Sequence, residues 1–279
     1  MSISESINLV LLQYKPKNNY DENLIYLNKL ISKIKAKKNV LVVCPELSLQ
    51  RYICITKNYQ NNADALHINS KIIKDLKSLS IKYQIYLSIT FFEKTKINKF
   101  NTCIVINPNG HILLKYHKKH IPSEKCFEEK YYFNESRNNF KYFLINDMKV
   151  GIMICWDQWH SLSYQSLKRK NVNLIICPTA IGSCKVNDTI YTLKDEKKKW
   201  IKVIEANSLM TNIPVAICNR IGSESDGDSK LKFWGGSFVT NASGEIISKL
   251  GLKEGSIHIE IKQKDQINAQ KMWNFIDIN

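Results

Sequence analysis

The sequence predicts an α/β protein, because apolar runs typical of strands alternate with segments of helical periodicity. The alternation begins at once, with a strand-like run at 7–13 followed by a helical pattern at 23–34. No repeat, low-complexity linker or break in composition divides the 279 residues. We therefore expect one domain, residues 1–279, in which helices cover the sheets.

The first third of the chain repeats strand and helix. Segment 23–34 places Leu and Ile at the three- and four-residue spacing of one helix face, and 40–44 is a buried-strand run that Pro45 stops. A second amphipathic helix is expected at 68–83. The apolar run 85–92, which follows it, is expected to be a strand.

The rest of the chain is richer in strands. Segments 101–106 and 111–116 flank Pro108-Asn109-Gly110, whose turn residues predict a hairpin. A helix is expected at 198–209. Further strands are expected at 148–154, 174–177, 215–218, 238–240, 246–249 and 256–261.

The formal charge of +16 raises the question of a nucleic-acid or membrane partner. Of the 41 Lys and Arg residues, however, only four are Arg, the residue best suited to bidentate recognition of bases and phosphates. The lysines are also spread along the chain, and no apolar run approaches the ~18 residues needed to cross a bilayer. We expect a solvated surface, with no nucleic-acid partner and no membrane partner.

Eight cysteines are present, without a C-x-x-C pair and without the Cys/His spacing of a zinc site. Several, such as Cys44 and Cys177, lie within apolar runs, where a thiol acts as a small apolar residue. The N-terminus has no basic region followed by an apolar stretch, so it does not look like a signal peptide. We expect a cytoplasmic protein with reduced thiols rather than a disulfide framework.

Three predicted strands end in reactive side chains. Glu46 follows the strand at 40–44, Lys118 follows the hairpin, and Cys155 follows the strand at 148–154. Sites in open α/β folds gather beyond the carboxyl ends of strands, so these residues could converge. A thiol nucleophile, a carboxylate base and a cation that stabilises an oxyanion are the groups needed to hydrolyse an amide-like bond.

The surrounding residues resemble three signatures of the nitrilase superfamily of carbon–nitrogen hydrolases, and the resemblance extends from about Ile7 to about Ser248. The signatures are Pro45-Glu46-Leu47, Lys118 before His120-Ile121-Pro122, and Ile154-Cys155-Trp156-Asp157. Further segments are similar to the N-carbamoylputrescine amidase branch of that superfamily. These are Ser88–Glu93, Phe100–Thr102, Glu129–Phe133, Cys155–Trp159, Pro178–Ser183, Asn219–Gly222 and Phe233–Phe238.

The resemblance implies a four-layer αββα sandwich that hydrolyses N-carbamoylputrescine to putrescine, carbon dioxide and ammonia, a step of polyamine synthesis. It makes Glu46 the general base, Lys118 the catalytic lysine and Cys155 the nucleophile. Glu129 and Trp156 become substrate-binding or supporting residues. The neighbouring cation of Lys118 should favour the thiolate of Cys155. The resemblance implies no metal or organic cofactor and a small-molecule substrate, and we expect a homo-oligomer.

The sequence departs from this branch in three places. Cys184-Lys185 stands where the branch carries a glutamate suited to the far ammonium of the substrate, so we expect another acid, such as Asp188, to replace it. The segment from His160 to Gln165 replaces the usual Phe-Pro-Glu continuation and a following Arg, which predicts local repacking. The tail from Met272 to Asp277 replaces an arginine-rich tail that makes subunit contacts.

Two alternatives follow from these departures. One is a related amidase that acts on another small carbamoyl-amine or ω-amide. The other is an inactive interaction protein, which is disfavoured because Glu46, Lys118, Cys155 and Glu129 are all retained.

Overall fold

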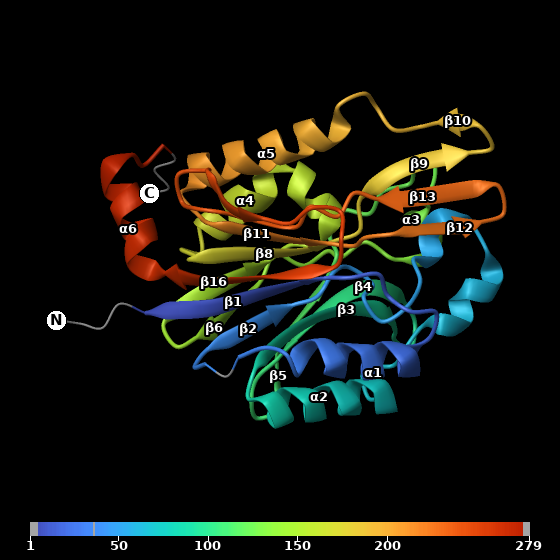
Figure 1. Cartoon of the computed structure of the whole chain (residues 1–279), viewed down its shortest axis with the longest axis horizontal. Helices are drawn as coiled ribbons and strands as arrows, with labels where there is room; N and C mark the ends of the chain where they lie inside the picture. The colour runs from blue at the N-terminus through green and yellow to red at the C-terminus, as the bar shows by residue number, and fades with distance from the viewer. Residues whose placement is uncertain (1–4, 36, 276–279) are drawn as a thin grey trace.

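The computed structural model describes residues 5–35 and 37–275. At its centre two six-stranded sheets lie face to face, and helices cover the outer face of each (Figure 1). The layers therefore follow the order helix, sheet, sheet, helix. This arrangement confirms the predicted α/β class and the four-layer αββα sandwich.

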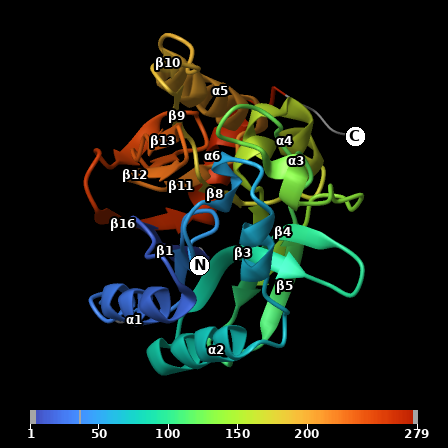
Figure 2. The same ribbon diagram turned by 90° about the vertical axis from the view of Figure 1, so that its right-hand side faces the viewer.

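The first sheet has the strand order β16-β1-β2-β3-β4-β5. Its strands are β16 (Gly255–Lys262), β1 (Ser6–Gln13), β2 (Val40–Val43), β3 (Tyr86–Lys94), β4 (Lys99–Ile106) and β5 (Ile112–His117). β1, β2 and β3 are parallel neighbours, and the other pairs are antiparallel. Helices α1 (Tyr20–Ile31) and α2 (Lys71–Tyr83) lie side by side over its outer face (Figure 2).

The alternation of side chains along β1 explains why this sheet is covered on both faces. Leu9 and Leu11 belong to the core between the two sheets, whereas Val10 and Leu12 belong to the core under α1 and α2. Successive side chains of a strand point to opposite faces, so a continuous apolar run requires apolar partners on each side.

The second sheet has the strand order β15-β14-β11-β8-β7-β6. Its strands are β15 (Ile246–Lys249), β14 (Phe238–Thr240), β11 (Val215–Asn219), β8 (Leu174–Thr179), β7 (Met148–Ile152) and β6 (Tyr142–Ile145). Helices α4 (Ser161–Lys168) and α5 (Glu196–Thr211) cover its outer face (Figure 1). Trp200 of α5 is fully buried in the core of this half.

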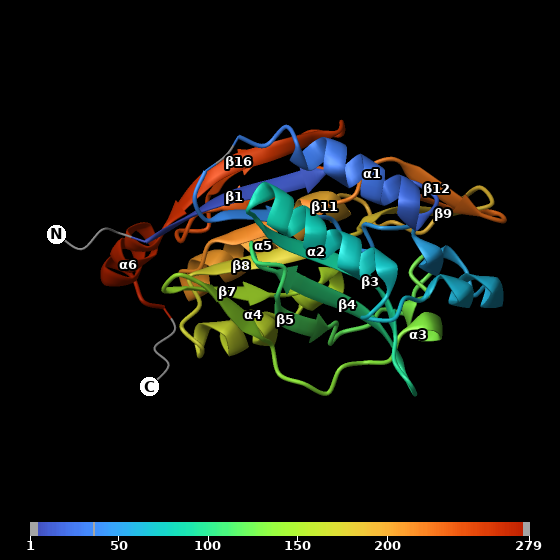
Figure 3. The same cartoon turned by 90° about the horizontal axis from the view of Figure 1, so that it is seen from below.

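A smaller sheet projects from one end of the molecule, with the order β10-β9-β13-β12. Its strands are β10 (Thr189–Ile190), β9 (Gly182–Val186), β13 (Ser229–Phe233) and β12 (Ser223–Asp226). The short helix α3 (Glu129–Tyr132) lies at the same end, and α6 (Gln263–Met272) lies at the opposite end (Figure 3). The carboxyl ends of β2, β7 and β8 point toward the α3 end.

The expectation of reduced cysteines is wrong for two of the eight. Cys126 and Cys184 form a disulfide, while the six other cysteines are free and buried. Cys126 lies in the loop before α3 and Cys184 lies on β9, so the two thiols are 58 residues apart in sequence but adjacent in the fold. No sequence pattern reveals such a pair, because its partners come from different elements.

Across residues 5–35 and 37–275, no helix combines the length and the apolar character that crossing a membrane requires.

Candidate active site

The four residues assigned by sequence to catalysis and its support converge at the α3 end of the sandwich. Glu46 lies just beyond β2, Lys118 directly follows β5, and Cys155 begins a 3-10 helix, η3 (Cys155–Trp159), just after β7. Glu129 is the first residue of α3. All four are buried, and Glu46 and Lys118 have no exposed surface. Strand ends deliver the reactive groups, as the sequence predicted.

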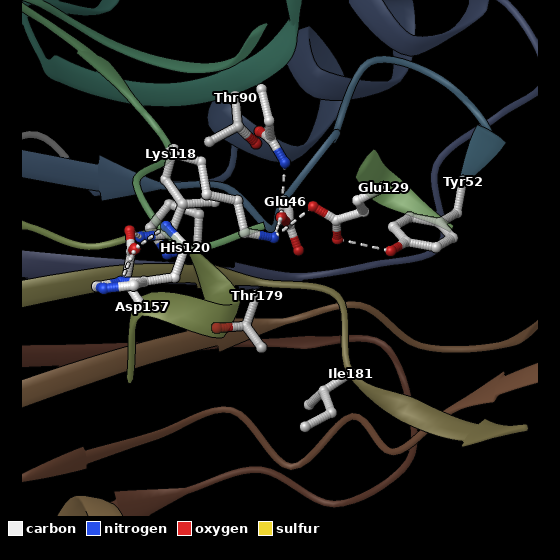
Figure 4. Close-up of polar contacts among 12 residues, drawn as sticks. Glu46, Tyr52, Thr90, Lys118, His120, Glu129, Asp157, Thr179 and Ile181 are labelled. Atoms are coloured by element: carbon white, nitrogen blue, oxygen red, sulfur yellow. Dashed lines mark hydrogen bonds and ion pairs between the residues drawn. The ribbon is translucent and has the colours of Figure 1, made fainter. Parts of the chain in front are cut away.

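Lys118 is the centre of the polar cluster (Figure 4). Its Nζ donates to Oε1 of Glu46 at 2.8 Å and to Oε2 of Glu129 at 2.7 Å. Asn101 Nδ2 also donates to Oε1 of Glu46, at 2.7 Å, and the Tyr52 hydroxyl donates to Oε1 of Glu129, at 2.8 Å. Among the described residues, the second oxygen of Glu46, Oε2, is buried without a hydrogen-bond partner. That oxygen remains available to accept a proton.

Cys155 occupies a strained backbone position, with a φ of 39°. Non-glycine residues with positive φ are uncommon, and such strain is concentrated at functional sites. The backbone N–H of Ala180, just beyond β8, donates to the Cys155 sulfur. The turn thus presents the thiol at the edge where β7 and β8 end.

Asp157 holds this turn against the lysine loop. Its Oδ2 accepts from the Ile154 N–H at 3.0 Å and from the Tyr116 hydroxyl at 2.8 Å. Its Oδ1 accepts from the His120 N–H at 2.9 Å and lies 2.8 Å from His120 Nδ1. One buried carboxylate therefore joins the nucleophile turn to the residues that follow Lys118. Asp157 had no role predicted from the sequence, although it lies within the Cys155-Trp156-Asp157 motif.

Burial has the largest effect on the thiol of Cys155. Burial raises its pKa well above the usual range, and the negative charge of Glu46 raises it further. Lys118 and the Ala180 N–H act in the opposite direction but do not prevail. The expected influence of Lys118 in favour of the thiolate is therefore present, but desolvation has the larger effect on the pKa.

Lys118 itself stays charged. Burial alone would lower its pKa, but the carboxylates of Glu129 and Glu46 outweigh burial and raise the pKa well above its usual value. For Glu129, burial raises the pKa to about 7, against the lowering effect of Lys118 and with a further increase from Glu46. The site thus pairs a permanent cation with one carboxyl that titrates near neutral pH.

Lys119 is not part of this cluster. It is half-buried, and no hydrogen bond or ion pair of its side chain occurs with the described residues, whereas Lys118 contacts both carboxylates. The geometry therefore agrees with the choice of Lys118 over its neighbour.

A pocket of about 270 Å³ opens above Cys155. Cys155, Trp156 and Glu129 line its inner part. Its wall also includes the exposed residues Glu124 and Lys125 and the half-buried Glu196, which begins α5. The pocket is large enough for a small aliphatic molecule and combines acidic and basic groups at its mouth.

The structure does not bring Asp188 to this pocket. Its side chain is fully exposed, and it pairs with Lys185 Nζ at 2.9 Å in the turn between β9 and β10. Lys185 is absent from the pocket wall, whereas Cys184 belongs to it. Glu196 and Glu124, rather than Asp188, are therefore the acids that line the outer pocket.

Comparisons with known proteins point to one family. The sequence model of the carbon–nitrogen hydrolase family matches residues 9–270. The chain is 32% identical to the citrullinase of Francisella tularensis over 247 residues, which cover 88% of this chain and 84% of the relative. It is 26% identical to the N-carbamoylputrescine amidase of Solanum lycopersicum over 271 residues, which cover 95% and 89%.

A solved structure is similar over almost the whole chain. The carbon–nitrogen hydrolase of Helicobacter pylori superposes with a TM-score of 0.90 at 27% identity, covering 97% of this chain and 94% of that one.

Proposed function

Because the chain belongs to the carbon–nitrogen hydrolase family and hydrolyses a non-peptide carbon–nitrogen bond, we propose that it acts on the terminal ureido group of a small aliphatic amine. The first candidate substrate is N-carbamoylputrescine. The observation that carries the proposal is the buried Cys155, Glu46, Lys118 and Glu129 cluster beneath a pocket with acids at its mouth.

The first half of the reaction uses the unpartnered oxygen of Glu46. Glu46 Oε2 takes the thiol proton as the Cys155 sulfur attacks the ureido carbon, so a thiol with a raised pKa needs to ionise only during attack. Lys118 Nζ and the backbone N–H of Trp156 stabilise the oxyanion. The tetrahedral intermediate then expels ammonia with the proton from Glu46, which leaves a thiocarbamate on Cys155.

The second half consumes one water. Glu46 removes a proton from the water, the oxygen attacks the thiocarbamate carbon, and the Cys155 thiol leaves with the proton that Glu46 returns. The released carbamic acid breaks down to carbon dioxide and the free amine. Glu129 keeps Lys118 oriented through both steps, because it contacts the ammonium at 2.7 Å.

The outer pocket supplies partners for the far end of the substrate. Glu124 and Glu196 are suited to the ammonium of N-carbamoylputrescine. Lys125 gives a reason for a second candidate, citrulline, which carries an α-carboxylate beside its ammonium. The 32% identity to a citrullinase also supports this second candidate.

Ammonia release with a panel of ureido compounds tests the proposal. N-Carbamoylputrescine and citrulline should be turned over with a kcat/KM at least about tenfold above that of neutral N-butylurea, since an ion pair at the mouth is worth at least about 1.4 kcal/mol. β-Ureidopropionate, which lacks the ammonium, should be poor. Equal turnover of charged and neutral tails would reject the tail assignment while leaving the hydrolase assignment intact.

Matched variants locate the partners of the tail. Glu196→Gln should raise KM for N-carbamoylputrescine but not for N-butylurea, whereas Asp188→Asn, outside the pocket, should match the unmodified protein for both. Lys125→Ala should raise KM for citrulline but not for the other two compounds. Cys155→Ala should abolish ammonia release, and residual activity above about 1% would contradict a covalent mechanism.

A further inference from the structure

The loop of residues 46–52 connects both carboxylates of the site to the rest of the protein. Glu46 stands at its start and contacts Lys118, and Tyr52 stands at its end and contacts Glu129 (Figure 4). The loop forms no strand and contains Leu47 in the left-handed region, with a φ of 47°. A non-glycine residue in that region persists only where the surrounding structure determines it.

Arg220 supplies that surrounding structure from the other sheet. Its side chain is fully buried, and it directly follows β11. Its guanidinium donates to the backbone carbonyls of Glu46 at 3.3 Å, Leu47 at 3.0 Å and Gln50 at 3.1 Å. One rigid, planar cation therefore holds three carbonyls of a single loop, which the point charge of a lysine cannot reproduce.

Glu224, on β12, completes the attachment. Its Oε1 accepts from Arg220 Nη2 at 2.5 Å, and its Oε2 accepts from the backbone N–H of Tyr52 at 2.6 Å. The aromatic rings of Tyr52 and Phe233 enclose the guanidinium, at 5.8 and 5.0 Å from their centroids. Both ends of the loop are thus held by one ion pair, in which Arg220 is fully buried and Glu224 is half-buried.

The same region also meets the nucleophile side. The carbonyl of Thr179 accepts from the N–H of Glu46 at 3.3 Å and from the N–H of Arg220 at 3.2 Å. The next residue, Ala180, donates to the sulfur of Cys155. The position of Arg220 therefore bears on the spacing between the base and the thiol.

We propose that Arg220 and Glu224 form a positioning pair that holds Glu46 and Tyr52 in the geometry needed for proton transfer from Cys155. Neither side chain touches the pocket, so the pair acts through the 46–52 loop. The inference rests on the Cys155, Glu46 and Lys118 chemistry of the proposed function but not on the identity of the substrate tail. A displacement of about 1 Å in such a group can lower a rate about 100-fold.

The test compares Arg220→Lys with Arg51→Lys. Arg51 lies at the same loop but donates only to the Asn61 side chain, at 2.7 Å, among the contacts of the described residues. Arg220→Lys should lower kcat by about 10- to 100-fold with KM changed less than about twofold, because proton transfer is affected but the pocket is not. Arg51→Lys should leave kcat and KM unchanged. Circular dichroism and the thermal midpoint establish the folded fraction of each variant.

A second readout is independent of substrate. Alkylation of Cys155 by iodoacetamide should be slower at pH 7 in Arg220→Lys and should approach the unmodified rate as the pH rises, since the thiol has lost its aligned base. Glu224→Gln keeps the shape of the acceptor but removes the charge, and it should give the same pattern more weakly. This variant decides the question if Arg220→Lys does not fold.

A folded Arg220→Lys variant with unchanged kcat and an unchanged pH dependence of alkylation would overturn the proposal. A fall in kcat that only matches the loss of folded protein would overturn it as well. The proposed function fails separately, through activity of Cys155→Ala.

Discussion

Each buried charge of the site contacts a group of opposite charge. An isolated ion without exposed surface would be strongly destabilising, but Lys118 contacts two carboxylates and each carboxylate has a further donor, Asn101 for Glu46 and Tyr52 for Glu129. Burial and the charge of Glu46 raise the pKa of the Cys155 thiol, which favours its neutral form before attack. In the proposed mechanism, the Cys155 thiol ionises only when Glu46 accepts its proton.

The choice between Lys118 and Lys119 leads to the first prediction. Lys118→Ala should lower kcat by at least about 100-fold, because it removes an oxyanion donor and leaves two buried carboxylates without their shared cation. Lys119→Ala should retain the unmodified kcat, since its side chain lies outside the cluster. Steady-state ammonia release measures both. An essential Lys119 beside a dispensable Lys118 would contradict the assignment.

The raised pKa of Glu129 gives a second prediction, on stability. The folded-state pKa of about 7 lies above the unfolded value of about 4.3. The contribution of Glu129 to the free energy of unfolding is therefore present in full below about pH 4.3 and is lost as the pH rises through 7. From pH 5 to 8 the unfolding free energy should fall by about 2–3 kcal/mol more in the unmodified protein than in Glu129→Gln. Urea unfolding at the two pH values measures this. The same pH dependence of the unfolding free energy in both proteins would contradict the raised pKa of Glu129.

At the scale of elements, the strands and helices with apolar periodicity were predictable. The hairpin at 101–106 and 111–116 is confirmed as β4 and β5, and the strands at 238–240 and 246–249 have the predicted bounds of β14 and β15. The strands β12 and β13 were missed because Ser, Asp and Lys dominate them. Their pairing with each other and with β9 decides their conformation.

The residues of the site also fall into those that the sequence predicts and those that it does not. Glu46, Lys118 and Cys155 were predictable because each follows an apolar run, and the motifs around them are contiguous. Tyr52 and Arg220 were not assigned a role, because their contacts join segments far apart in sequence, such as Arg220 with the carbonyls of 46, 47 and 50. Such contacts depend on how two sheets pack, which no local pattern encodes.

The disulfide between the pre-α3 loop and β9 gives the third prediction. Protein unfolded without reductant should take up six alkyl groups rather than eight, which intact mass resolves. Reduction should lower the unfolding free energy by about 2–4 kcal/mol, since the bond restricts the unfolded chain. The double variant Cys126→Ala, Cys184→Ala should not respond to reductant. Eight alkylated thiols in the unmodified protein would contradict the bond.

At the scale of the molecule, several large apolar side chains remain exposed on the outer helices and after α6. Leu209 and Met210 on α5 and Trp273 beyond α6 are 38%, 43% and 66% exposed. Burial of such groups favours association, and the homo-oligomer stays a prediction. Sedimentation velocity should show a species larger than 32.4 kDa that Met210→Lys shifts toward the monomer. A monomer at all concentrations would contradict it.

The net charge of +16 gives the last prediction. Charge of this size attracts polyanions at long range, but specific recognition needs side chains that fit base edges, and Lys is a poorer fit than Arg. Only four Arg are present, and one of them, Arg220, is fully buried in the ion pair with Glu224. Any binding to duplex DNA should therefore come from counterion release alone.

Such binding should be independent of sequence and should weaken steeply between about 50 and 200 mM salt. Fluorescence anisotropy with two unrelated duplexes measures both properties, and ammonia release should be the same with and without DNA. Preference for one duplex that persists at 200 mM salt would show a built nucleic-acid surface. If salt abolishes binding to both duplexes, the lysines form a solvated surface and do not recognise DNA specifically.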